Sequence, residues 1–377
     1  MNPDPYDTAS QVRAWLASHR RNQPVTHEVV HEALMALPLM VPDSQLPALT
    51  EMMIDHLTGA GPIAPLLRDA SVTDVLVNGP DSVWIDRGAG LERMDVTFPS
   101  QEMVRTCAVR LAAQAGRVLD DAHPWVDAHL PGGRRLHAVV PPISMTGTVL
   151  SIRSFLSTPL TLDDLVVRGS VADDIAVILR GLIANRRSLL VTGGTGSGKT
   201  TFVNSLIGEC APCDRIVIVE DTHELRPRHD HVVSLQSRPP GAGQVVTLTD
   251  LVRQSLRMRP DRIVVGEVRG AEIVDLLLAL NTGHTGSFAT LHANKVAEVA
   301  SRIEVLAAGS AIGSDAALRA FGAGMDAVVH LGREPHRHVN EIGIVAKAGD
   351  HHAVIPVWTC AVGFMPDGEA ALRALAT

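Results

Sequence analysis

The pattern of hydrophobic and polar positions changes character along the 377-residue chain. Residues 8–60 place apolar side chains at helical spacing between proline breaks, which predicts about three short helices. Residues 61–155 switch to short β-rich runs separated by glycine and proline turn signals, with one helix expected at 100–116. From residue 171 onward, continuous apolar runs alternate with amphipathic helices, which is typical of a parallel α/β sheet.

These changes predict the domain organisation of the chain. We expect a helical N-terminal appendage over residues 1–60, a small α/β domain over 61–155, a linker or hinge over 156–173 and a larger α/β domain over 174–377. No catalytic constellation is evident in the appendage, which favours a packing or partner-binding role. The expected strands of the small domain are residues 74–78, 82–86, 94–98, 125–130, 135–140 and 149–153.

A glycine-rich stretch follows the short apolar run at residues 189–191 and precedes a helical pattern. Gly193 and Gly198 have the spacing of the G-x-x-x-x-G-K-[ST] phosphate loop, in which successive backbone N–H groups turn toward an anion. Lys199 should reach the β- and γ-phosphates of ATP, and Thr200 should place its hydroxyl on Mg²⁺. The predicted nucleotide-binding residues are Gly194, Thr195, Gly196, Ser197, Gly198, Lys199, Thr200 and Thr201.

Two later apolar runs, at residues 215–219 and 262–265, are followed by carboxylates. The first delivers Glu220, and the second delivers Glu267. Because the carboxyl ends of parallel strands face the ligand crevice of such a sheet, both side chains are expected near the phosphate loop. The sequence therefore predicts Mg²⁺ binding by Thr200 and Glu267, and water activation by Glu220 or Glu267.

Composition and charge narrow the classes of function. The formal net charge is −8 and aromatic residues make up 3% of the chain, which argues against a nucleic-acid channel with stacking platforms. No apolar run is long enough for a membrane span, and the first residues lack the pattern of a signal peptide, so a cytoplasmic location is expected. Cys210 and Cys213 have ligand-like spacing but no second close pair, and we expect no zinc site there.

Four ordered motifs resemble those of the type II/type IV secretion ATPases, most closely the branch that drives tight-adherence (Flp-type) pilus assembly. The resemblance implies a PAS-like small domain and a RecA-like P-loop ATPase domain with a twisted, largely parallel sheet. It also implies a homo-hexamer with ATP bound between domains and neighbouring subunits. The matching segments are residues 193–200, the acidic box at 218–224, the Walker B region at 256–270 and the histidine box at 281–294.

Carried over by position, the resemblance assigns further catalytic roles. Arg135 and Arg153 match arginines that approach the phosphates, and His292 matches a residue that couples nucleotide state to movement. Glu267 is similar to the Walker B glutamate and Glu220 to the acidic-box residue, and which of them acts as the base stays open.

The resemblance implies inner-membrane platform proteins as partners and peripheral association with the membrane through them. The net charge and the low aromatic content favour no direct contact with nucleic acid. Two alternatives remain: a conjugation or effector-export ATPase of the same superfamily, and a DNA-handling motor with a similar core.

Overall fold

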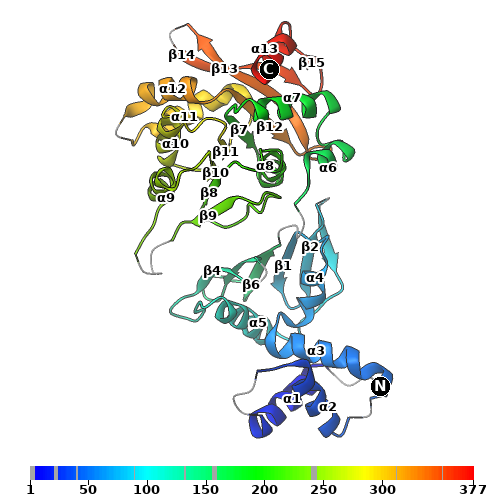
Figure 1. Cartoon of the computed structure of the whole chain (residues 1–377). Helices are drawn as coiled ribbons and strands as arrows, with labels where there is room; N and C mark the ends of the chain where they lie inside the picture. The colour runs from blue at the N-terminus through cyan, green and yellow to red at the C-terminus, as the bar shows by residue number, and fades with distance from the viewer. Residues whose placement is uncertain are drawn as a thin grey trace. The chain divides into compact units, whose positions relative to one another are not determined.

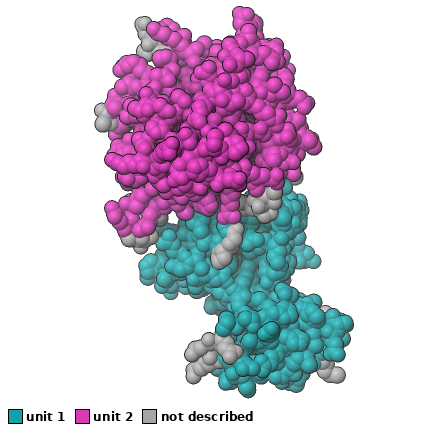
Figure 2. Space-filling model, in the orientation of Figure 1, with its two compact units in different colours: residues 1–157 teal, residues 158–377 magenta. Residues whose placement is uncertain are grey.

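The computed structural model describes residues 5–20, 24–39, 41–88, 90–130, 133–154, 159–238, 244–310, 312–349 and 351–377. The chain divides into two compact units, Met1–Ser157 and Thr158–Thr377 (Figure 2). The expected turn at Pro131 and Gly132 lies outside the described residues. Across the described ranges, no helix combines the length and the apolar character needed to cross a membrane.

Unit 1 begins with helices that pack on one another through their apolar faces (Figure 1). Val12, Val30, Leu34 and Met53 are buried at the centre of this cluster, so the helical spacing seen in the sequence corresponds to a real core. Thr26 caps the second helix by accepting a hydrogen bond from the backbone N–H of Val29. The helices are α1 (Pro5–His19), α2 (His27–Ala36), η1 (Asp43–Gln45), α3 (Leu46–Thr58), η2 (Gly61–Ile63) and α4 (Ala64–Arg68).

The rest of unit 1 is a six-stranded antiparallel sheet with strand order β3-β2-β1-β6-β5-β4. Alternate side chains of each central strand are buried in a core shared with α5, η2 and α4, as the two-residue period of a half-covered sheet requires. The elements are β1 (Asp74–Gly79), β2 (Ser82–Asp86), β3 (Leu91–Met94), α5 (Gln101–Gln114), β4 (Trp125–His129), β5 (Arg135–Val139) and β6 (Val149–Arg153).

One predicted strand of unit 1 is wrong. We expected a strand over residues 94–98, whereas β3 ends at Met94. The carboxylate of Asp86 accepts hydrogen bonds from the N–H groups of Gly88 and Gly90, which closes the turn within four residues. The returning strand therefore pairs at once, with Leu91 opposite Asp86 and Met94 opposite Val83.

Unit 2 contains a nine-stranded mixed sheet with strand order β15-β14-β13-β12-β7-β11-β10-β8-β9. The pairs from β12 to β9 are parallel, and the pairs from β12 to β15 are antiparallel. The predicted fold class, α/β with N-terminal helices and a largely parallel central sheet, is confirmed. The strands are β7 (Leu189–Gly193), β8 (Ile216–Glu220), β9 (Val232–Gln236), β10 (Arg262–Val268), β11 (Phe288–Leu291), β12 (Ala327–Gly332), β13 (His338–Ala348), β14 (His351–Thr359) and β15 (Gly363–Phe364).

Helices cover both faces of this sheet (Figure 1). Within β7, Leu189 and Val191 pack with α6, α7, α8 and α13, whereas Leu190 packs with the helices of the opposite face, α9 to α12. Burial on both faces explains why the central strands read as continuous apolar runs. The helices are α6 (Leu162–Val167), α7 (Asp173–Ala184), α8 (Lys199–Gly208), α9 (Leu248–Ser255), η3 (Leu256–Met258), α10 (Glu272–Leu280), η4 (Val296–Glu298), α11 (Val299–Ala307), α12 (Gly313–Gly324) and α13 (Gly368–Ala376).

The segment expected to be a linker, residues 156–173, contains α6. Leu162, Leu165 and Val171 are buried in the core of unit 2, and Thr161 and Asp164 form a capping box at the start of α6. Residues 155–158, where this segment leaves unit 1, lie outside the described residues. The hinge and the predicted domain limits at residues 60, 155 and 173 therefore stay predictions.

Candidate active site

The glycine-rich stretch forms a tight loop between β7 and α8. Gly193, Gly196 and Gly198 have φ angles of +150°, +74° and +93°, which L side chains rarely adopt. A Cβ on Gly193 would also lie 2.5 Å from Ser197 Oγ and 2.7 Å from the carbonyl oxygen of Leu331. Glycine is thus required by both conformation and space at the start of the loop. Lys199, Thr200 and Thr201 form the first turn of α8, where backbone N–H groups and the helix dipole favour an anion.

Lys199 is buried inside this loop. Its ammonium donates hydrogen bonds to the carbonyl oxygens of Gly193 (2.9 Å) and Gly194 (3.0 Å), and its Nζ lies 3.4 Å from His292 Nε2. Burial lowers the pKa of Lys199, and the nearby Glu267 carboxylate opposes that effect. A buried ammonium whose hydrogen bonds go to uncharged loop carbonyls is well suited to a phosphate ligand.

Glu267 and His292 come from adjacent parallel strands and meet beside Lys199. Glu267 lies near the end of β10, and His292 directly follows β11. His292 Nε2 is 3.1 Å from Glu267 Oε1, while Glu267 Oε2 accepts a hydrogen bond of 2.7 Å from Arg269 Nε. Burial, followed by the Lys199 charge, lowers the pKa of His292. Both residues were predicted from the sequence, and the structure brings them together with Lys199.

Glu220, the last residue of β8, is 4% exposed. Its Oε1 accepts hydrogen bonds from the N–H groups of Glu224 (3.1 Å) and Leu225 (3.0 Å). Its Oε2 is buried and accepts no hydrogen bond from the described residues, with His223 Nδ1 3.6 Å away. Because an unsatisfied buried carboxylate oxygen is costly, this oxygen is available to accept a hydrogen bond from a ligand. Gly266 of β10 makes room for this side chain, because a Cβ there would lie 2.6 Å from Glu220 Cγ.

The oxygen ligands around Thr200 suit Mg²⁺. Thr200 Oγ1 lies 3.4 Å from Glu224 Oε2, and Glu267 is close enough to the neighbouring Lys199 to influence its pKa. The described residues contain no cluster of three or more His, Cys, Asp or Glu arranged for a metal. Mg²⁺ does not require one, because it commonly takes one or two protein oxygens and completes its shell with water and phosphate. The donor set therefore fits this ion.

Arg135 and Arg153 belong to unit 1 and lie opposite each other on paired strands, β5 and β6. Arg135 forms an ion pair with Asp127, and its Nε donates to Asp127 Oδ1 at 2.9 Å. Arg153 Nε donates to Asp74 Oδ1 at 3.0 Å. Both guanidinium groups are partly exposed. Their predicted action on phosphate would require them to exchange these carboxylates for the ligand, and it stays a prediction.

Three basic side chains beside the phosphate loop were missed by the sequence reasoning. His330 of β12 is 6% exposed, and its Nδ1 lies 3.0 Å from the hydroxyl of Thr192, one residue before Gly193. Arg333 and Arg337 lie in the five-residue loop between β12 and β13 and approach the phosphate loop from outside. No sequence motif predicts these positions, because they reach the site only through the pairing of β12 with β7.

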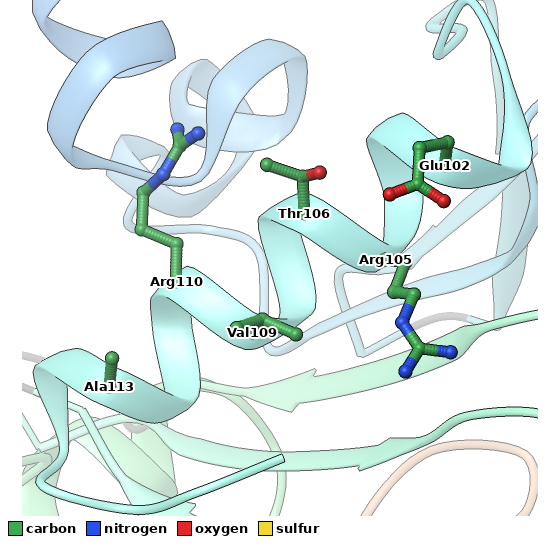
Figure 3. A pocket seen from close by; sticks show the side chains of 6 residues that line it. All are labelled: Glu102, Arg105, Thr106, Val109, Arg110 and Ala113. Carbon is green, nitrogen blue, oxygen red and sulfur yellow. The ribbon is translucent and has the colours of Figure 1, made fainter. Parts of the chain in front are cut away.

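A hollow on α5 of unit 1 shows none of this chemistry (Figure 3). Arg105 and Arg110 point to opposite sides of the helix, so their charges do not converge on one ligand. Arg110 donates to the carbonyl oxygen of His56, and Arg105 pairs with Asp121. The hollow is lined by Glu102, Arg105, Thr106, Val109, Arg110 and Ala113.

Comparisons with known proteins agree with this geometry. The family model described as "Type II/IV secretion system protein" matches residues 56–342. A putative conjugal transfer protein of Mycobacterium tuberculosis is 44% identical over 89% of this chain and 98% of its own length. The conjugal transfer protein TrbB of Rhizobium radiobacter is 36% identical over 64% of this chain and 74% of its own length. The structure of the Legionella pneumophila ATPase DotB shares the fold, with a TM-score of 0.53, 20% identity, and coverage of 75% of this chain and 79% of that one.

Proposed function

The chain belongs to the type II/IV secretion system protein family, and we propose that it is an ATP-hydrolysing motor subunit of a secretion machine. One observation carries this proposal: a buried lysine in a glycine loop, at the start of a helix, lies beside a glutamate and a histidine from the ends of adjacent parallel strands. Catalysis of phosphoryl transfer depends mainly on positioning the reactants and neutralising the charge of the phosphates. The lysine, glutamate and histidine are arranged to do both.

The proposed roles follow from the position of each side chain. Residues 194–201 hold the phosphates through backbone N–H groups, and Lys199 exchanges its loop carbonyls for phosphate oxygens. Glu220 accepts a hydrogen bond from the attacking water through Oε2, which accepts none from the described residues. Glu267 orients His292, whose Nε2 lies between the glutamate and Lys199. Either glutamate can serve as the base, and substitution of each in turn will assign it.

Thr200 and Glu267, with Glu224 beside them, are proposed to hold Mg²⁺. When bound, this ion neutralises charge on the β- and γ-phosphate oxygens. Arg135 and Arg153 are proposed to supply further positive charge to the phosphates during turnover, at the cost of their ion pairs with Asp127 and Asp74.

The same proposal extends to the assembly. We propose a homo-hexamer at the cytoplasmic face of the inner membrane, attached through platform proteins of the machine. The motif resemblance favours assembly of a tight-adherence pilus, whereas the names of the relatives favour the alternative of conjugal transfer. Deleting the gene and measuring surface pilin, DNA transfer and protein export separates these assignments, because loss of only one of the three identifies the machine.

The decisive biochemical test is Lys199→Ala. The variant should fold, bind ADP and ATP much more weakly than the wild type and hydrolyse almost no ATP, because the phosphates lose their buried cation. The measurements are thermal unfolding, nucleotide titration and phosphate release by the full chain. Turnover near the wild-type rate would refute the assignment of the phosphate site.

A further inference from the structure

The loop between β12 and β13, residues 333–337, lies against the phosphate loop within the same unit. Arg337 Nε donates a hydrogen bond of 2.9 Å to the carbonyl oxygen of Gly196, and its Cδ would lie 3.5 Å from a Cβ on Gly198. Arg333 Nη1 would lie 3.5 Å from a Cβ on Gly196. Arg337 therefore contacts the part of the chain that is shaped to surround an anion, and Arg333 lies close to it.

Among the described residues, no carboxylate neutralises the charges of these arginines. Neither forms an ion pair within the described part of the chain, although Glu334 lies between them in sequence. This differs from Arg135 and Arg153, which each pair with an aspartate. A guanidinium group without an ion-pair partner at the rim of a phosphate loop can donate two parallel hydrogen bonds to phosphate oxygens.

The loop is also held from its other side. His336 Nε2 lies 3.2 Å from the carbonyl oxygen of Gly169, and the N–H of Val339 donates to the carbonyl oxygen of Ser170 at 2.8 Å. The turn after α6 thus anchors the β12–β13 loop while Arg337 reaches the phosphate loop. A contact fixed at both ends can restrain the shape of the glycine-rich segment, whose backbone is otherwise flexible in conformation.

We propose that the β12–β13 loop is part of the nucleotide site: Arg337 holds the phosphate loop in its binding shape through Gly196, and Arg333 binds phosphate oxygens of the nucleotide. This inference rests on the proposed function and adds two residues from the same subunit to the site. Arg337 is a positioning residue, because it acts through the Gly196 carbonyl. Its loss should weaken ADP and ATP alike and leave the chemical step nearly unchanged.

The test is nucleotide binding by Arg337→Ala, Arg337→Lys and Arg333→Ala in the full chain. Arg337→Ala removes a hydrogen bond from a charged donor, and we expect ADP affinity to fall on the order of 10- to 100-fold. We expect kcat at saturating ATP to stay within about threefold of the wild type. Arg337→Lys should recover much of the loss, because an ammonium can donate to the same carbonyl. Arg333→Ala should weaken ADP about fivefold at low salt and less at high salt, as expected for an exposed charge.

Arg319→Ala is the matched control. Arg319 is an exposed arginine on α12, so its removal changes the net charge equally without touching the phosphate loop. ADP affinity within twofold of the wild type in both Arg337→Ala and Arg333→Ala would overturn the inference. A lysine variant as weak as Arg337→Ala, with a lowered unfolding midpoint in both, would also overturn it by indicating a purely structural role. Unchanged ADP binding in Lys199→Ala would instead refute the proposed function itself.

Discussion

Gly266→Ala tests the role of Glu220 without altering any group that takes part in the chemistry. The added Cβ would lie 2.6 Å from Glu220 Cγ and 3.1 Å from its Oε1. Carbon atoms in contact prefer about 3.5–4.0 Å, so the glutamate has to shift by roughly 1 Å. That shift disturbs the hydrogen bonds that Glu220 accepts from the N–H groups of Glu224 and Leu225. A misplacement of about 1 Å in a catalytic group costs on the order of 100-fold in rate.

The assay is ATP turnover at saturating substrate, together with ADP affinity and thermal unfolding. We expect kcat to fall on the order of 100-fold while ADP affinity changes less than about threefold, because Glu220 is assigned to water and not to phosphate binding. Gly208→Ala in α8 is the matched control, since its Cβ would lie an ordinary 3.8 Å from the Arg228 carbonyl oxygen. In a Glu220→Gln background, Gly266→Ala should add little. Wild-type turnover, or full additivity of the two changes, would contradict a catalytic role for Glu220.

The remaining predictions concern the other polar groups of the site. Glu267→Gln should retain ATP binding with Mg²⁺ but turn over very slowly, whereas normal turnover beside an inactive Glu220→Gln would give Glu220 the role of base. Arg135→Ala and Arg153→Ala should each lower turnover on the order of 1000-fold with ADP affinity nearly intact, and wild-type turnover in both would leave these arginines as ion-pair partners only. Burial lowers the pKa of His330. The unfolded chain therefore binds the proton more readily, and stability is full above about pH 6.5 and lost as the pH falls below it. His330→Gln should accordingly reduce the fall in unfolding midpoint between about pH 7.5 and about pH 5.5, and an unchanged fall would contradict this.

The part of the site built from consecutive parallel strands could be predicted from the sequence. Each apolar run marks a strand buried on both faces, and the residue that follows it lies at the carboxyl edge of the sheet. Glu220, Glu267 and His292 could therefore be expected near Lys199 without knowledge of their contacts. Their detailed partners could not be predicted, because the pairing of Glu267 with Arg269 and the room that Gly266 leaves for Glu220 depend on side-chain packing.

The contribution of β12 and the loop after it to the site was not predicted, for a physical reason. His330 is 138 residues beyond Thr192 and Arg337 is 141 residues beyond Gly196, and they reach these partners because β12 pairs with β7, with His330 opposite Thr192. Nothing local in the sequence specifies which strand lies next to β7. The prediction of a strand at residues 94–98 was wrong for a local reason. A single turn closed by Asp86 fixes the register of β3. Local patterns therefore predict element type more reliably than register or neighbour.

The buried charged groups at the two ends of the parallel strands in unit 2 differ in how completely their hydrogen bonds are satisfied. At the amino end of β10, Arg262 is 2% exposed and donates to Asp214 Oδ2 (2.7 Å) and to the carbonyl oxygens of Gly286 and Ile183 (both 2.9 Å). A buried charge with its donors satisfied fixes the elements it joins, because any displacement leaves it unpaired. At the carboxyl ends, one oxygen of Glu220 has no hydrogen-bond donor among the described residues, and Lys199 donates to loop carbonyls. The proposed function requires these groups to exchange their partners for phosphate and water, and the buried contacts of Arg262 at the opposite edge would keep the strand order intact during that exchange.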